Sequence, residues 1–195
     1  IQLGYAIEPM LANAAQSMDE VKSFLGEDEA LLEWKYDGVR CQAHFSTEQG
    51  VTLFSRHLLD STKQYPAAVA SLRDARKSNV HSFILDAEIV AISEDGGGLK
   101  LLPFQELTRR STVDGSSLFQ VCVYAFDLLF LNGTSLLETP FPSRRKMLQD
   151  NFSLSPGFVL AQSTTLQVCD EDAVLKTLRE ATSIGAEGLM IKRLT

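Results

Sequence analysis

The sequence has few cysteines, no long apolar run and no surplus of basic residues. Cys41, Cys122 and Cys169 are widely separated and form no CxxC pair, which argues against a zinc site. An odd number of isolated cysteines fits a reducing compartment. No stretch approaches the ~18 apolar residues of a membrane helix, and no signal or transit peptide is visible. We therefore expect a globular enzyme or binding module that is not associated with a membrane.

Basic residues are outnumbered, with 18 lysines and arginines against 25 acidic residues and a net charge of −7. This balance argues against nucleic-acid binding through bulk charge, but it leaves room for a local basic groove or for basic domains elsewhere. Arg109-Arg110 and the run 144–146 are candidates for contacts with a DNA backbone, and solvated helix ends explain them equally well. Glycines 96–98 do not form a P-loop, because no GxxxxGK[ST] pattern follows.

The length of 195 residues and the 45% hydrophobic content suit one domain with a sizeable core. Alternation and turn signals predict strands over 30–36, 39–45, 51–55, 83–92, 121–128, 159–162 and 189–192. Helices are predicted after a capping box at Ser17 and over 67–76, 103–110, 143–151 and 170–181. Strands outnumber helices, so the pattern predicts an α+β fold of antiparallel β-sheets flanked by helices. The chain begins at Ile1 without an initiator methionine, and we expect a fragment of a longer protein.

The hexapeptide KYDGVR, residues 35–40, is the most informative motif. It places Lys35 at a strand end, before an Asp37-Gly38 turn. An ordinary lysine, with a pKa of about 10.4, is neutral in only about one molecule in 2,500 at pH 7, so a nucleophilic lysine needs nearby cations or desolvation. Arg40 carries a planar fork suited to ribose or phosphate oxygens. A solvated lysine before an ordinary hairpin turn is the structural alternative.

Carboxylates interrupt two apolar strands. Asp86 and Glu88 fall on one face of the strand 83–92, where a carboxylate is costly unless it is paired or bound to metal. The alternative is that Glu88 simply points to solvent. Glu187 starts the last predicted strand and Lys192 ends it. Strict alternation puts these two on opposite faces, so both reach one site only if the strand is irregular near Gly188.

Two further candidates are weaker when they are taken alone. Phe126 can offer a ring face to a nucleobase, although an aromatic residue in an apolar strand is more often part of the core. Arg56 can bind a phosphate or can be a plain surface arginine.

The order of these motifs is more specific than any one of them. Lys-x-Asp-Gly-x-Arg, Ser-Arg, a strand glutamate, an aromatic strand and Glu-Gly-x-x-x-Lys together resemble the nucleotidyltransferase motifs of ATP-dependent DNA ligases. Residues 8–12 look like the entry segment of this domain in cellular DNA ligases, and residues 104–107 and 124–133 look most like the eukaryotic replicative DNA ligase branch. The resemblance spans residues 1–195 and implies an adenylation domain with the ATP-grasp-like nucleotidyltransferase fold of these enzymes.

The resemblance implies that Lys35 attacks the α-phosphate of ATP and carries AMP. Seven other residues would surround ATP and Mg²⁺: Glu33 beside the adenine, Phe126 stacked on it, Arg40 and Glu88 at the ribose, Arg56 and Lys192 at phosphates, and Glu187 with Glu88 at the metal. AMP would then pass to the 5′-phosphate of nicked double-stranded DNA, and the 3′-hydroxyl would seal the strand.

The family's last lysine-rich motif, its OB-fold domain and its N-terminal DNA-binding domain lie outside residues 1–195. We therefore expect a monomer that acts with those domains in cis and that alone adenylates itself weakly or not at all. The resemblance also implies DNA replication, repair and recombination in the nucleus, with mitochondria as the alternative location. RNA ligases and mRNA capping guanylyltransferases share Lys-x-Asp-Gly and stay as alternatives, as does a catalytically incomplete nucleotide-binding module.

Overall fold

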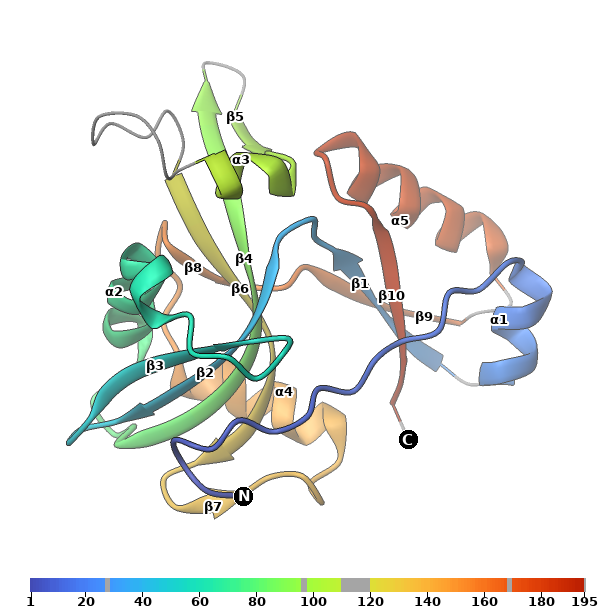
Figure 1. Ribbon diagram of the computed structural model, residues 1–195. Helices are drawn as coiled ribbons and strands as arrows, with labels where there is room; N and C mark the ends of the chain where they lie inside the picture. The colour runs from blue at the N-terminus through green and yellow to red at the C-terminus, as the bar shows by residue number, and fades with distance from the viewer. Residues whose placement is uncertain (27–28, 96–97, 110–119, 168–169, 195) are drawn as a thin grey trace.

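The computed structural model describes residues 1–26, 29–95, 98–109, 120–167 and 170–194, and their strands form two sheets (Figure 1). The seven-stranded sheet has the order β3-β2-β4-β6-β7, with β5 beside β4 and β8 beside β6. Its strands are β2 (Val39–Ser46), β3 (Gly50–Ser55), β4 (Ser82–Asp95), β5 (Gly98–Leu101), β6 (Gln120–Leu131), β7 (Thr134–Ser135) and β8 (Phe158–Leu160). All of these pairings are antiparallel except that of β6 with β8.

The smaller sheet places β1 (Glu29–Lys35) between β9 (Ser163–Gln167) and β10 (Gly188–Arg193), both antiparallel to it. Ala30 and Leu32 on one face of β1 pack with Leu25 of α1 (Met18–Leu25) and Val174 of α5 (Glu171–Ser183). Because side chains alternate along a strand, Leu31, Glu33 and Lys35 point to the other face of β1.

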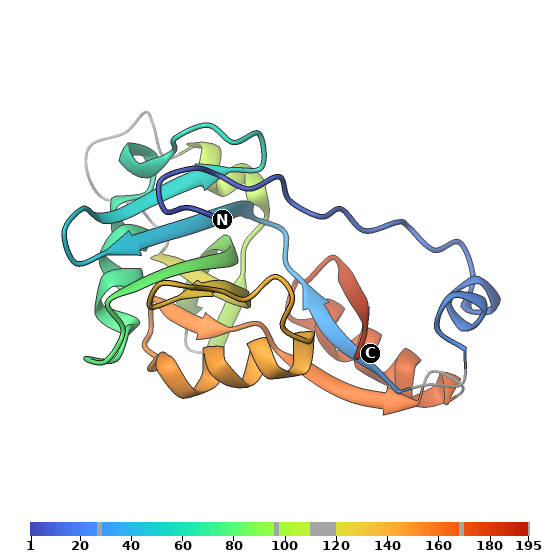
Figure 2. The same ribbon diagram turned by 90° about the horizontal axis from the view of Figure 1, so that it is seen from below.

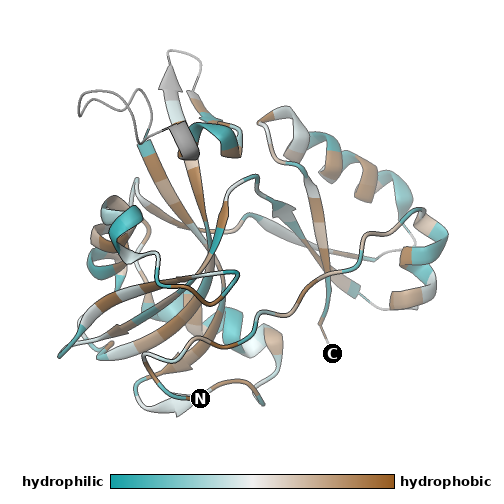
Figure 3. Ribbon diagram, viewed as in Figure 1, coloured by the Kyte–Doolittle hydropathy of each residue, from teal (hydrophilic) through white to brown (hydrophobic). Residues whose placement is uncertain are grey.

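One face of the larger sheet forms the main core. The helices α2 (Pro66–Ala75) and α4 (Phe141–Asn151) cover it, and the strands of this sheet are largely apolar in Figure 3. Phe83, Leu85 and Phe158 are fully buried there with Leu72 of α2 and Leu148 of α4. Two short elements, η1 (Thr62–Gln64) and α3 (Phe104–Arg109), lie in the connections. No helix within the described ranges combines the length and apolar character needed to cross a bilayer.

The opposite face of the larger sheet holds the N-terminal segment, which runs across it in extended form (Figure 2). Three side chains of β2 bind its backbone: Arg40 donates to Met10 O at 2.8 Å, Gln42 accepts from Ile7 N at 2.7 Å and donates to Ile7 O at 3.1 Å, and His44 Nδ1 accepts from Gly4 N at 3.1 Å. His44 Nε2 lies 2.8 Å from Gln42 Oε1, and burial lowers the pKa of His44 to about 4. The polar face predicted for β2 thus binds the backbone of the N-terminal segment.

The predicted fold class is confirmed, with differences in detail. The main strands and helices occur where alternation and capping signals predicted them, and Ser17 Oγ caps α1 by accepting from Glu20 N at 3.2 Å. The strands β7 and β9 were not predicted. Gly98, expected in a loop, begins β5, while residues 96–97 lie outside the described ranges.

Candidate functional site

Lys35 is the last residue of β1, and the next turn carries the chain from the smaller sheet into the larger one. Its ammonium forms an ion pair with the Glu187 carboxylate, and Glu187 N donates to Lys35 O at 2.8 Å. The Lys35 side chain is 48% exposed. The amine therefore lies at the junction of the two sheets, open to a ligand and beside a carboxylate.

The two sheets also meet through the residue after Lys35. The ring of Tyr36 stacks on that of Tyr124 in β6, with centroids 4.0 Å apart, and its hydroxyl accepts from Gln162 N at 3.0 Å. Tyr36 is 7% exposed. This contact fixes the point at which the chain passes from one sheet to the other.

The turn after Lys35 is held tightly against β4. A Cβ added to Gly38 would lie 2.3 Å from Ile89 O and 3.0 Å from Glu88 Cγ, so only glycine fits there. Asp37 Oδ2 accepts from Phe104 N at 3.1 Å, which anchors the other side of the turn. The close approach brings Glu88 within electrostatic range of Lys35. Burial raises the pKa of Glu88 to about 8, against the opposing effect of Lys35 and Arg40.

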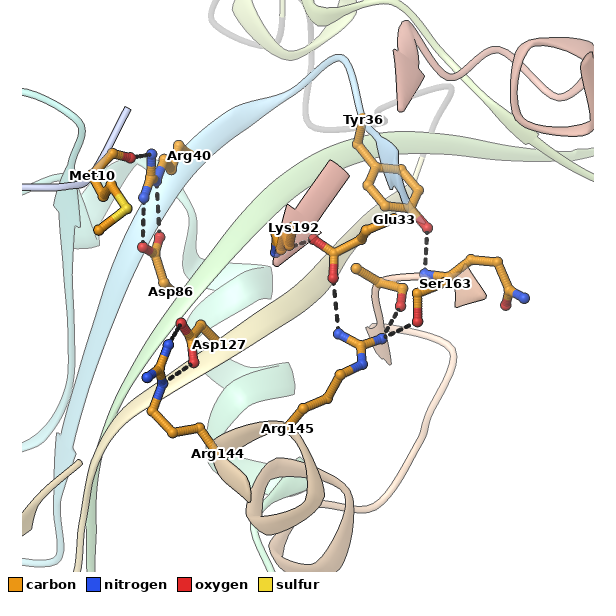
Figure 4. Close-up of polar contacts among 12 residues, drawn as sticks. Met10, Glu33, Tyr36, Arg40, Asp86, Asp127, Arg144, Arg145, Ser163 and Lys192 are labelled. Carbon is orange, nitrogen blue, oxygen red and sulfur yellow. Dashed lines mark hydrogen bonds and ion pairs between the residues drawn. The ribbon is translucent and has the colours of Figure 1, made fainter. Parts of the chain in front are cut away.

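Arg40 lies on the same face of the larger sheet, opposite Glu88 in the β2–β4 register. Its guanidinium binds the Asp86 carboxylate in a two-point contact of 3.0 and 2.7 Å (Figure 4). Burial raises the pKa of Asp86, and Arg40 opposes that shift. The Asp86 carboxylate lies inside an apolar strand, where an unpaired charge would be unfavourable, and Arg40 supplies the opposite charge. Sequence reasoning noted Asp86 but did not find its partner.

Phe126 reaches the site through an irregularity in β6. Ala125 pairs with Ala87 and Asp127 pairs with Asp86, so Phe126 is the extra residue of a β-bulge. The Arg40 guanidinium lies 5.6 Å from its ring centroid. Phe126 is half-buried beside Tyr36 and Tyr124 rather than part of the main core.

Glu33 is the most buried charged side chain of the site, with 3% of it exposed. Its Oε1 accepts from Lys192 Nζ at 2.5 Å and its Oε2 accepts from Arg145 Nη1 at 2.8 Å (Figure 4). Arg145 Nη2 also donates to Ala161 O at 2.6 Å and to Ser163 Oγ at 2.8 Å. Burial raises the pKa of Glu33, and the two cations oppose that shift.

The last strand, β10, is irregular at Gly188, as the convergence of Glu187 and Lys192 on one site required. Gly188 has a φ of +155° and pairs with Lys35, while Glu187 just before it turns to the Lys35 amine. Lys192 nevertheless binds Glu33 on the same side of β1. Glu187 and Lys192 therefore reach one region, which strict alternation forbids.

The basic run 144–146 does not form an outward patch. Arg144 binds Asp127 with two contacts of 2.8 Å, and Arg145 is buried against Glu33, so the interpretations of these two as DNA-facing or solvated are wrong. Lys146 is exposed and pairs with Asp150 at 3.0 Å. Arg110 and the side chain of Arg109 lie outside what the structure describes. Helical spacing with buried Leu148 was the signal that pointed Arg145 inward.

Arg56 lies apart from this cluster. It is exposed, and within the described ranges it has no hydrogen bond or ion pair. It borders an open hollow of about 330 Å³ on the face that carries the N-terminal segment, lined by Glu8, Pro9, Leu11, Arg56, His57 and Leu58. The structure thus gathers seven of the eight predicted residues at the junction of the sheets and leaves Arg56 outside their contacts.

The predicted metal ligands are the carboxylates of Glu88 and Glu187. No group of three or more His, Cys, Asp or Glu side chains suited to a metal occurs in the described part of the chain. Glu88 and Glu187 both interact with Lys35. Because Mg²⁺ is commonly held by one or two carboxylates, waters and substrate phosphates, this pair fits a metal that arrives with a nucleotide.

Comparison with known proteins finds a family model, curated relatives and a solved structure that are all described as DNA ligases. Residues 9–195 match the family model described as ATP dependent DNA ligase domain. The chain is 38% identical over 194 residues to DNA ligase 1 of Drosophila melanogaster and 38% identical over 197 residues to DNA ligase 1 of Dictyostelium discoideum, covering 98% and 100% of this chain. It spans 26% and 16% of the length of those two proteins. A mycobacterial DNA ligase D complexed with ATP superimposes with a TM-score of 0.60 at 26% identity, over 85% of this chain and 48% of that one.

Proposed function

Because the chain belongs to the family of ATP-dependent DNA ligase domains, we propose that Lys35 is the nucleophile that takes AMP from ATP in the first step of ligation. The observation that carries this proposal is the position of the Lys35 amine. It is open to solvent at the junction of two sheets and in contact with Glu187. Arg40, Glu88 and the ring of Phe126 lie on the facing strands, where a nucleotide would contact them.

The proposed step exchanges one bond to phosphorus for another. Lys35 Nζ forms a bond with the α-phosphorus, the bond from that phosphorus to the bridging oxygen breaks, and pyrophosphate leaves. The lysine must lose a proton first, and Glu187 is placed to accept it because it contacts the ammonium. Mg²⁺, held by Glu88 and Glu187 with phosphate oxygens, would supply charge neutralisation on the leaving group.

Arg40 and Lys192 supply the positive charge of the site from the protein side. Arg40 is fixed by Asp86, so its fork is oriented before a ligand arrives. Lys192 is tied to Glu33 and would contact the α-phosphate after a movement of its side chain.

We propose that the later steps follow the family pattern in the whole protein. AMP passes from Lys35 to the 5′-phosphate at a nick in double-stranded DNA, and the 3′-hydroxyl displaces it. The chain covers about a quarter or less of the DNA ligase 1 relatives, so further domains in cis would bind the DNA and complete the site. We expect a nuclear protein, and weak or absent self-adenylation by these 195 residues alone.

Covalent labelling tests the proposal. The full-length protein is incubated with α-labelled ATP and Mg²⁺ and quenched in alkali, because a phosphoramidate is stable in alkali and labile in acid. We expect a labelled protein in the wild type and none in Lys35→Arg. Lys146→Arg is the matched control, since Lys146 is an exposed lysine that pairs with Asp150, and its labelling should equal that of the wild type.

Label that persists in Lys35→Arg would refute the assignment of the nucleophile. The same assay separates the alternatives: preference for GTP would favour a capping enzyme, and sealing of nicked RNA over nicked DNA would favour an RNA ligase. Efficient nick sealing by residues 1–195 alone would contradict the expected need for further domains.

A further inference from the structure

Lys192 occupies a position that the proposed function requires it to leave. Its ammonium binds Glu33 at 2.5 Å and lies 4.9 Å from the ring centroid of Phe126 and 5.1 Å from that of Phe141. In the proposed reaction Lys192 contacts the α-phosphate, and Phe126 receives the adenine. Nucleotide binding therefore has to draw Lys192 away from the Glu33 carboxylate.

That movement has an electrostatic cost. The Glu33 side chain is 3% exposed, so water cannot replace a departing cation. Removing one partner from a buried ion pair is strongly unfavourable when nothing compensates the remaining charge. A second cation that stays in place removes most of this cost.

Arg145 has the properties of that second cation. It comes from α4, whereas Lys192 comes from β10, so the two can move independently. Two further contacts hold its guanidinium, to Ala161 O and to Ser163 Oγ. Its side chain is 11% exposed against 22% for Lys192, which within the described part of the chain has one hydrogen bond and two ring contacts.

We propose that Arg145 is a positioning residue that stays on Glu33 as a fixed counter-ion and so releases Lys192 to the nucleotide. This inference rests on the proposed function. Arg145 would touch neither ATP nor the reacting atoms. It would act through Glu33, and its effect would appear in the ATP concentration that the first step requires.

The test measures Lys35 labelling in single-turnover reactions of the full-length protein over a range of ATP concentrations. Arg145→Gln should raise the ATP concentration for half-maximal labelling at least tenfold, because Lys192 then holds Glu33 alone. Arg145→Lys keeps the charge and should stay within about threefold of the wild type. In a Glu33→Gln background, which removes the buried charge, Arg145→Gln should change the half-maximal concentration less than threefold.

Arg144→Gln is the matched control. Arg144 is the neighbouring arginine of α4, and it binds Asp127 and Thr139 O rather than Glu33. Its replacement should lower the thermal stability without a shift in the half-maximal ATP concentration. Equal losses in Arg145→Gln and Arg145→Lys, or a loss from Arg145→Gln that is undiminished in the Glu33→Gln background, would overturn the inference.

A variant that does not fold and a wild type that does not label have different consequences for the inference. If Arg145→Gln does not fold, we expect the double variant with Glu33→Gln to fold and to label, and its failure would contradict the role of charge. If the wild type forms no Lys35-linked AMP, the proposed function itself fails. A wild type that labels normally while the double-mutant comparison is additive refutes only the inference on Arg145.

Discussion

The substitution Gly38→Ala tests how the lysine turn is built. Gly38 does not have a positive φ, so alanine adds no backbone strain, and the effect comes from contact alone. The new Cβ would lie 2.3 Å from Ile89 O, and β2 and β4 would have to separate by about 0.7 Å to reach the 3.0 Å that real contacts allow. Overpacking of this kind costs about 2–3 kcal/mol, at the upper end of the usual range because the obstacle is main chain.

The expected loss is measurable in two assays. In a chain of this size it corresponds to a fall of about 5–10 °C in the melting temperature. Labelling of Lys35 by ATP should slow about tenfold or more, since a loss of about 1.4 kcal/mol in transition-state stabilisation is already tenfold and the same separation moves Glu88 from Lys35. Both effects arise from one displacement, so they should appear together.

Gly50→Ala is the control for this prediction. Gly50 lies in open space with a φ of +76°, so alanine there meets no atom and adds only backbone strain of about 1–2 kcal/mol. We expect lower stability with an unchanged labelling rate. A melting temperature of Gly38→Ala equal to that of the wild type, or a wild-type labelling rate despite a lower melting temperature, would contradict this prediction.

Three further predictions concern ionisable side chains of β2 and β4. Glu88 has a raised pKa of about 8, so the unliganded protein should lose stability as the pH rises from about 4.5 to 8, and Glu88→Gln should flatten this slope in urea unfolding. His44 has a lowered pKa of about 4, so its contribution of about 3 kcal/mol should be lost as the pH falls from 6.5 to 4, and His44→Gln should show a smaller loss over that window. Asp86→Asn should destabilise the protein by about 3 kcal/mol in the same assay, because Arg40 loses its buried partner, and wild-type stability would contradict this.

The strands that could be predicted were those with apolar alternation. Residues 39–45 alternate strictly, and both faces of β2 are used as that pattern indicates. The strand β9, with the sequence STTLQ, carries one apolar residue, so its pairing with β1 depends on hydrogen bonds that no local pattern reveals. Strand β7 has two residues and gives no periodic signal.

The site was predictable in its residues more than in its contacts. The order of the motifs pointed to Lys35, and the apolar surroundings of Glu88 showed that its carboxylate was unusual. The pairing of Glu33 with Arg145 joins residues 112 positions apart, which no local pattern reveals. A run of basic residues on a helix is also expected to face solvent unless the buried face of that helix is known. The bulge that exposes Phe126 arises from the register between two strands, which one strand's sequence does not contain.

The N-terminal segment on β2 has a further consequence for how this protein tolerates change. Gly4, Ile7 and Met10 are bound at every third residue, and each bond goes to the main chain. Met10 is 88% exposed, so the bond from Arg40 depends on the main chain of this residue rather than on its side chain. We expect substitutions other than proline along this segment to leave the main-chain bonds intact, whereas adding or removing one residue would move Met10 away from Arg40 or Gly4 away from His44.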